Sequence, residues 1–164
     1  MLGAIVGDIV GSVYEFHNTK DYGFHMITSH SRFTDDTVMT LAVAKWLTGD
    51  KAHKGSCLIE CMQELGRKYP NAEYGGTFRR WLYSNTPKPY NSWGNGAAMR
   101  VSPVGYLAHS LDEALELAKI SAEVTHNHPE GIKGAQAIAS AIYLVRQGKA
   151  KKDIQQYVSD TFDY

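Results

Sequence analysis

Apolar residues along this chain recur every three or four positions, which is the spacing of helices that bury one face. Between them lie stretches rich in Gly, Pro, Asn and Ser, residues that favour turns and loops. No stretch alternates apolar and polar residues in the manner of a half-buried strand. The pattern therefore predicts an all-α fold in a single domain over residues 1–164, with helices over 2–16, 34–49, 53–68, 78–82, 110–120, 130–146 and from 150 onwards.

The first predicted helix has an apolar row, a row of glycines and a polar face. The apolar row is Ile5, Ile9, Val13 and Phe16, and the glycines are Gly3, Gly7 and Gly11. A glycine costs about 1 kcal/mol relative to alanine inside a helix, so three of them predict close approach by a neighbouring backbone. Asp8, Ser12 and Glu15 share the polar face. Either Asp8 caps another element and Glu15 ends the helix in solvent, or both acids serve a site.

Residues 33–39 read Phe-Thr-Asp-Asp-Thr-Val-Met and place two adjacent carboxylates directly before an apolar helix. Thr34 is a favourable N-cap, and acids at Asp35 and Asp36 suit the positive end of the helix dipole. The alternative is that these three residues offer oxygen ligands to a hard divalent cation such as Mg²⁺, which would relieve the repulsion between the carboxylates. From this stretch alone, the cap is the simpler interpretation.

A loop over residues 84–96, rich in Pro, Asn, Ser and Gly, leads into residues 97–101. If a helix begins there, its free backbone N–H groups suit a phosphate. His126 and His128 could ligate a metal, but such a pair more often caps the next helix or faces water. Arg79 and Arg80 could likewise meet a phosphate, although a solvated face is the simpler interpretation.

The composition narrows the setting in which the protein works. Lys plus Arg and Asp plus Glu number 17 each, so the formal net charge is zero and no general nucleic-acid or membrane surface is indicated. No apolar run reaches the roughly 20 residues that span a bilayer. Cys57 and Cys61 form neither a zinc pattern nor a disulfide framework, which favours a reducing compartment and a cytoplasmic localisation.

Three blocks stand in order along the chain: residues 3–16 (GAIVGDIVGSVYEF), residues 33–39 (FTDDTVM) and residues 93–100 (WGNGAAMR). Together they resemble the ADP-ribosylglycohydrolase family, which includes the dinitrogenase-reductase-activating glycohydrolases. Thr125-His126 fits a fourth, weaker block, and the resemblance extends over nearly the whole chain. It implies a compact orthogonal helical bundle that removes ADP-ribose from a modified protein or small molecule, with a nucleic acid substrate left open.

The resemblance also implies a binuclear Mg²⁺ site, in which Mn²⁺ could substitute, at the base of an ADP-ribose cleft. Thr34, Asp35 and Asp36 would be metal ligands. Glu15 and Asp36 would be the catalytic acids, with Glu15 positioning or activating water or contacting the ribose. The diphosphate, the nearby ribose and the pocket wall would be contacted by Asn91, Ser92, Trp93, Gly94, Asn95 and His126. Asp8 matches a Gly-Asp of the family and is expected to be structural.

One part of the family pattern is missing from this sequence. Family members usually continue to a Gly-Gly-Asp-x-Asp-Thr block that supplies the remaining metal ligands, whereas here Ser159-Asp160-Thr161 is only a superficial echo. The chain is therefore expected to lack C-terminal helices, to expose an apolar face, and either to self-associate or to need a C-terminal portion. Two other classes of function stay open: a module that binds ADP-ribose without turnover, and a folded fragment without a ligand.

Overall fold

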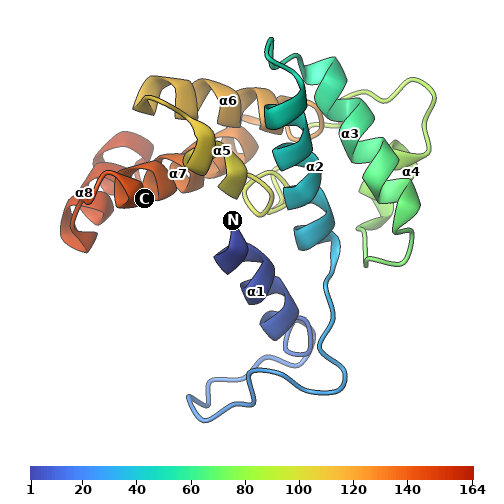
Figure 1. The fold of residues 1–164 in the computed structure, drawn as a ribbon, viewed down its shortest axis with the longest axis horizontal. Helices are drawn as coiled ribbons and strands as arrows, with labels where there is room; N and C mark the ends of the chain where they lie inside the picture. Colours follow the sequence, from blue (N-terminus) through green and yellow to red (C-terminus); the bar gives the residue numbers. More distant parts are fainter.

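The computed structural model describes residues 1–164 as eight α-helices without a strand, which confirms the all-α prediction (Figure 1). In chain order the helices are α1 (Leu2–Gly11), α2 (Asp35–Gly49), α3 (Gly55–Lys68), α4 (Gly76–Leu82), α5 (Ser102–Leu107), α6 (Leu111–Glu123), α7 (Pro129–Arg146) and α8 (Lys151–Phe162). In Figure 1, α2 and α3 run down the page whereas α6 and α7 run across it. The two groups of helices therefore cross, as expected for an orthogonal bundle.

The central element is α2, which packs against α1, α3 and α5. Its core face is fully buried and includes Val38, Met39, Val43 and Trp46. Burial of each such side chain stabilises the fold by roughly 1.5–3 kcal/mol. The indole N–H of Trp46 donates a hydrogen bond of 3.0 Å to the carbonyl of Lys54, so the buried ring leaves no polar atom unpaired. On the other side of the core, α7 packs against α5, α6 and α8.

The first helix is shorter and more exposed than its sequence pattern predicts. It ends at Gly11 instead of Phe16, and the chain turns over residues 12–17. The hydroxyl of Ser12 holds this turn, because it donates to the carbonyl of Ile9 and accepts from the N–H of Arg32. No residue of α1 is buried. The expected backbone neighbour along the glycine row is also absent, since a Cβ at Gly3, Gly7 or Gly11 would meet nothing within 4 Å.

The second correction concerns residues 97–101, where a helix start was expected. Residues 95–100 form a turn instead, and α5 begins at Ser102. Pro103 lies at the start of α5, where its missing N–H leaves no helical hydrogen bond unmade. No helix N-terminus therefore opens directly from the glycine-bearing loop.

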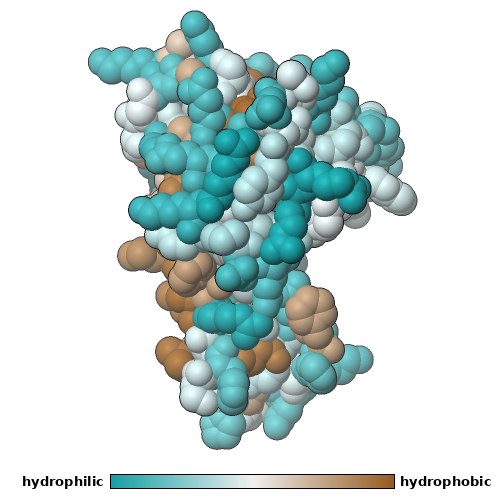
Figure 2. All heavy atoms as spheres, turned by 90° about the vertical axis from the view of Figure 1, so that its right-hand side faces the viewer, coloured by the Kyte–Doolittle hydropathy of each residue, from teal (hydrophilic) through white to brown (hydrophobic).

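Apolar side chains remain uncovered on α1. Leu2 is 76% exposed and Val6 is 54% exposed. Figure 2 shows hydrophobic side chains gathered at the height at which α1 lies in Figure 1. No helix of the structure combines the length and the apolar character that crossing a bilayer demands. Cys57 and Cys61 are free thiols, both half-buried on α3.

Two glycine substitutions test this description of the packing. A Cβ at Gly66 would lie 2.6 Å from Cδ2 of Leu82, whereas one at Gly7 meets nothing within 4 Å. We expect Gly66→Ala to lower the free energy of unfolding by about 1–3 kcal/mol because the core is already full. Gly7→Ala should leave it unchanged or raise it by up to about 1 kcal/mol. Urea denaturation measures both, and a destabilising Gly7→Ala would mean that α1 has a close neighbour after all.

Candidate functional site

A cleft of about 530 Å³ is lined by residues from five separate parts of the chain. The turn after α1 contributes Glu15, and the first turn of α2 contributes Asp35 and Asp36. The approach to α4, the loop before α5 and the link between α6 and α7 supply the other walls. These walls include Glu73, Gly75, Gly76, Thr77, Tyr90, Ser92, Asn95, Gly96, Arg100 and His126.

Asp8 connects α1, which precedes Glu15, to α2, which carries Asp35 and Asp36. Its carboxylate accepts hydrogen bonds from the backbone N–H groups of Thr34 (2.8 Å) and Thr37 (3.1 Å). It also accepts from the hydroxyls of both threonines. A carboxylate from α1 therefore satisfies free N–H groups at the start of α2 and complements its dipole. This is the structural, capping role that was one of the two interpretations of Asp8.

Thr34 is the N-cap of α2, as predicted. Its hydroxyl accepts from the N–H of Asp36 and donates to Asp8 at 2.6 Å. The residue is only 2% exposed and does not line the main cleft. It lines a neighbouring cavity of about 460 Å³ together with Asp8, Glu15 and Asp36. The capping interpretation is thus confirmed, and ligation of a metal by Thr34 stays a prediction.

The acidic group of the cleft consists of Glu15, Asp35 and Asp36. Burial, together with the charges of Asp36 and Glu15, raises the pKa of Asp35 to about 7. Burial and the charges of Asp8 and Glu15 also raise the pKa of Asp36. None of the three forms an ion pair. The cleft therefore holds negative charge that no cationic side chain of the protein compensates.

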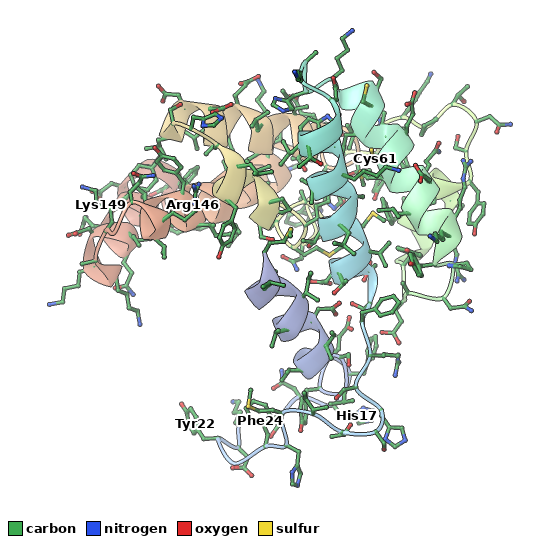
Figure 3. All side chains as sticks on the ribbon, viewed as in Figure 1. His17, Tyr22, Phe24, Cys61, Arg146 and Lys149 are labelled. Carbon is green, nitrogen blue, oxygen red and sulfur yellow. The ribbon has the colours of Figure 1, made fainter.

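These acids do not by themselves make a metal centre. No three His, Cys, Asp or Glu side chains lie together in an arrangement that could hold a metal ion. The histidines between α1 and α2 do not add metal ligands to the acidic group, because His17, His25 and His30 are all exposed. Figure 3 shows His17, Tyr22 and Phe24 on the segment that extends away from the other helices.

The loop predicted to hold the diphosphate is only partly turned to the cleft. Ser92 and Asn95 line it, but Asn91, Trp93 and Gly94 do not. The N–H of Asn91 donates to the side-chain oxygen of Asn127 at 2.7 Å. Trp93 is 72% exposed and its ring lies 5.8 Å from that of His128. Trp93 would thus need a bound molecule that extends beyond the cleft to make contact.

Of the two histidines His126 and His128, only His126 lines the cleft. It is buried, and its burial and the charge of Arg100 lower its pKa to about 4. His128 caps α7 instead, because its Nδ1 accepts from the N–H of Glu130 at 3.1 Å. The pair therefore divides between a pocket residue and a helix cap.

Arg100 lines the cleft and was not assigned a role from the sequence. Its guanidinium is 1% exposed and donates to the carbonyls of Gly96 and Ser121 and to the hydroxyl of Thr125. Burial lowers its pKa to about 10. The signal available beforehand was an arginine at the end of the small, apolar run Ala97-Ala98-Met99. Arg79 and Arg80 are exposed, as the simpler interpretation of that pair had it.

The capping role of Asp8 leads to a stability prediction. Asp8→Asn keeps the size of the side chain but turns an N–H₂ group toward threonine donors, so at least one of the four hydrogen bonds that the carboxylate accepts is lost. We expect a loss of about 1–3 kcal/mol in the free energy of unfolding, measured by urea denaturation. Asp112→Asn is the matched control, because Asp112 is an exposed acid in the first turn of α6. Equal effects of the two substitutions would contradict the cap.

Comparison with known proteins identifies the family to which the sequence belongs. The profile of the ADP-ribosylglycohydrolase family matches residues 1–164. ADP-ribosylhydrolase ARH3 of Mus musculus is 28% identical over 185 aligned residues, which cover 93% of this chain and 50% of the relative. ADP-ribosylarginine hydrolase Tri1 of Pseudomonas putida (strain GB-1) is 24% identical, covering 93% of this chain and 47% of the relative. The chain thus spans about half the length of the curated relatives it matches. From its first to its last residue, it belongs to the ADP-ribosylglycohydrolase family.

Proposed function

We propose that this protein hydrolyses the glycosidic bond that joins ADP-ribose to a modified target. The observation that carries the proposal is the cleft of about 530 Å³, in which three unpaired carboxylates face Ser92, Asn95 and His126. Family membership supports it, as do the names of relatives, which describe an ADP-ribosylhydrolase and an ADP-ribosylarginine hydrolase. The target is an ADP-ribosylated protein or small molecule, with nucleic acid as a further substrate to test.

The chemistry follows from the acidic group. Cleavage at the anomeric carbon passes through a state with positive charge on the sugar, which the negative charge of the acidic group stabilises. Glu15 lies in a turn and is exposed, so its carboxylate can reach a water molecule in the cleft. It then accepts the proton of the attacking water as a general base.

We include Mg²⁺ in this proposal, with two ions and with Mn²⁺ as a substitute. The donor set fits a hard cation, because Thr34, Asp35 and Asp36 offer only oxygen atoms and the acids lack a cationic partner. When bound, the metal would orient ribose hydroxyls and lower the pKa of a bound water. Thr34, as the capping residue, would keep the first turn of α2 in place for the two carboxylates.

The part of the cleft lined by Ser92, Asn95 and Arg100 would hold the nucleotide part of the ligand. Ser92 and Asn95 carry neutral polar groups, and Arg100 adds a buried positive charge without a carboxylate partner. Anionic oxygens are favoured there, because they compensate a charge in a place of low dielectric constant. The proposed orientation puts the diphosphate near this part of the cleft and the scissile bond near Glu15.

A turnover assay tests the proposal. Peptides carrying ADP-ribose on serine or on arginine are incubated with the protein, and released ADP-ribose is quantified. Glu15→Gln and Asp36→Asn should each lower the rate about 100-fold or more, since each removes a charge that the reaction uses while keeping the volume. Asp160→Asn is the control, because Asp160 is exposed on α8 and does not line the cleft.

The outcomes separate the classes of function. Near-normal rates in Glu15→Gln or Asp36→Asn would remove that residue from the catalytic group. Calorimetry then measures binding of ADP-ribose to the protein. Binding of ADP-ribose without its release from any peptide would indicate a binding module. If ADP-ribose is neither bound nor released, the proposal is contradicted.

The metal is tested by chelation. If Asp35 and Asp36 hold Mg²⁺, excess EDTA should abolish release of ADP-ribose, and added Mg²⁺ or Mn²⁺ should restore it. Asp35→Asn should weaken Mg²⁺ binding in calorimetry about tenfold or more, because a neutral oxygen replaces a charged ligand. Full turnover in EDTA, with no retained metal by elemental analysis, would overturn the metal part of the proposal and leave the acidic group as the sole catalyst.

A further inference from the structure

A buried series of hydrogen bonds joins Arg100, Thr125 and His126. Nη2 of Arg100 donates to the hydroxyl of Thr125 at 2.9 Å. The same hydroxyl lies 2.7 Å from Nδ1 of His126. Thr125 is fully buried and Arg100 nearly so, and no water-exposed group takes part in either bond. This series of hydrogen bonds ends at His126, whose ring lines the cleft.

Counting protons along this series of hydrogen bonds assigns the tautomer of His126. A guanidinium has only donors, so the oxygen of Thr125 must be the acceptor toward Arg100. The single proton of the Thr125 hydroxyl then needs an acceptor of its own, and Nδ1 of His126 is the one within hydrogen-bond distance. Nδ1 therefore carries no proton, and the proton of the neutral ring is on Nε2.

The surroundings keep the ring neutral. Arg100 and Tyr90 are the charged and titratable side chains that face it, with the Tyr90 ring centroid 5.9 Å away. Gly131 of α7 packs against the histidine, and no carboxylate is among the groups that shift its pKa. A second proton would break the bond to Thr125 and would add a positive charge beside Arg100. Burial and Arg100 accordingly hold the pKa at about 4.

The other ring nitrogen is free to bind a ligand. Nε2 of His126 makes no hydrogen bond within the protein. It lies against Gly96, where a Cβ would come within 2.9 Å of it. A side chain at Gly96 would therefore press against the ring of His126, and both residues line the cleft.

We propose that Arg100 and Thr125 are positioning residues, which hold His126 as the Nε2–H tautomer so that it donates a hydrogen bond to an oxygen of the ligand in the cleft. The identity of that ligand, ADP-ribose, rests on the proposed function. The tautomer does not, because it follows from the hydrogen bonds of the protein alone.

The first test is NMR spectroscopy of the wild-type protein. The chain has seven histidines, and comparison with His126→Gln identifies the signals of His126. Two-bond ¹H–¹⁵N spectra distinguish a protonated Nε2 from a protonated Nδ1. We expect a single Nε2–H tautomer whose shifts stay constant from pH 8 down to about 5. A protonated Nδ1, a mixture of tautomers, or titration near pH 6.5 would overturn the proposal.

The second test compares Thr125→Val with Thr125→Ser. Valine has the shape of threonine but no hydroxyl, whereas serine keeps it. Thr125→Val should give a mixture of tautomers, raise the pKa of His126 and weaken ADP-ribose binding about tenfold, the loss expected for one hydrogen bond. Thr125→Ser should behave as the wild type in all three respects. Unchanged tautomer and affinity in Thr125→Val would overturn the proposal, as would a mixture of tautomers in Thr125→Ser.

The readouts also separate this proposal from the proposed function. If Thr125→Val does not fold, the wild-type spectrum and Thr125→Ser still decide the tautomer. If the wild-type protein shows the Nε2–H tautomer but does not bind ADP-ribose, the proposed function is wrong and the ligand part of this proposal falls with it. Binding of ADP-ribose that leaves the Nε2–H signal unshifted would overturn the donated hydrogen bond specifically.

Discussion

The candidate site depends on the carboxylate of Asp8. This one group, on a helix without buried residues, receives four hydrogen bonds from Thr34 and Thr37 at the start of α2. It holds α1 against α2 and thereby places Glu15, which follows α1, beside Asp35 and Asp36. Without that cap, the glycine-rich helix would have little apolar packing to hold it, and the three acids of the cleft would have no fixed relation to one another.

The cleft contains opposite charges that do not form ion pairs with each other. Glu15, Asp35 and Asp36 are not paired with Arg100, although all four line the same space. Leaving a buried charge unpaired is unfavourable, and here Arg100 is accommodated by three hydrogen bonds to neutral oxygens. Unpaired charges of this kind lower the stability of the fold. They suit a ligand whose anionic part lies near Arg100 and whose electron-poor part lies near the three acids.

The sequence allowed prediction where a single local rule decides the outcome. The helical spacing of α2, the cap at Thr34 and the end of the helix predicted over residues 130–146 all depend on near neighbours in the chain, and the structure agrees with each. His128 likewise caps the helix that follows it. The membership of Glu15, Asp35 and Asp36 in one cleft could be expected only because blocks far apart in the chain matched a family pattern.

The predictions that failed, and the residue that was missed, depend on interactions between segments far apart in the sequence. The glycine row of α1 suggested a neighbour that the structure does not place there, because periodicity shows which face is small but not what covers it. The end of α1 is set by Ser12 accepting from Arg32, a contact across 20 residues that local pattern does not reveal. Arg100 was overlooked for the same reason. Its partners Ser121 and Thr125 lie 21 and 25 residues further along the chain.

The cap on α2 also has a bearing on the order of folding. Asp8 is separated from Thr34 by 26 residues and from Thr37 by 29, so the intervening segment must close into a loop before the cap can form. Loop closure costs conformational entropy that only the cap and the contacts of α1 with α2 repay. The helices from α2 to α7 make their contacts without α1 and can assemble first. We therefore expect the acidic group of the cleft to be completed at a late step of folding, after the core has formed.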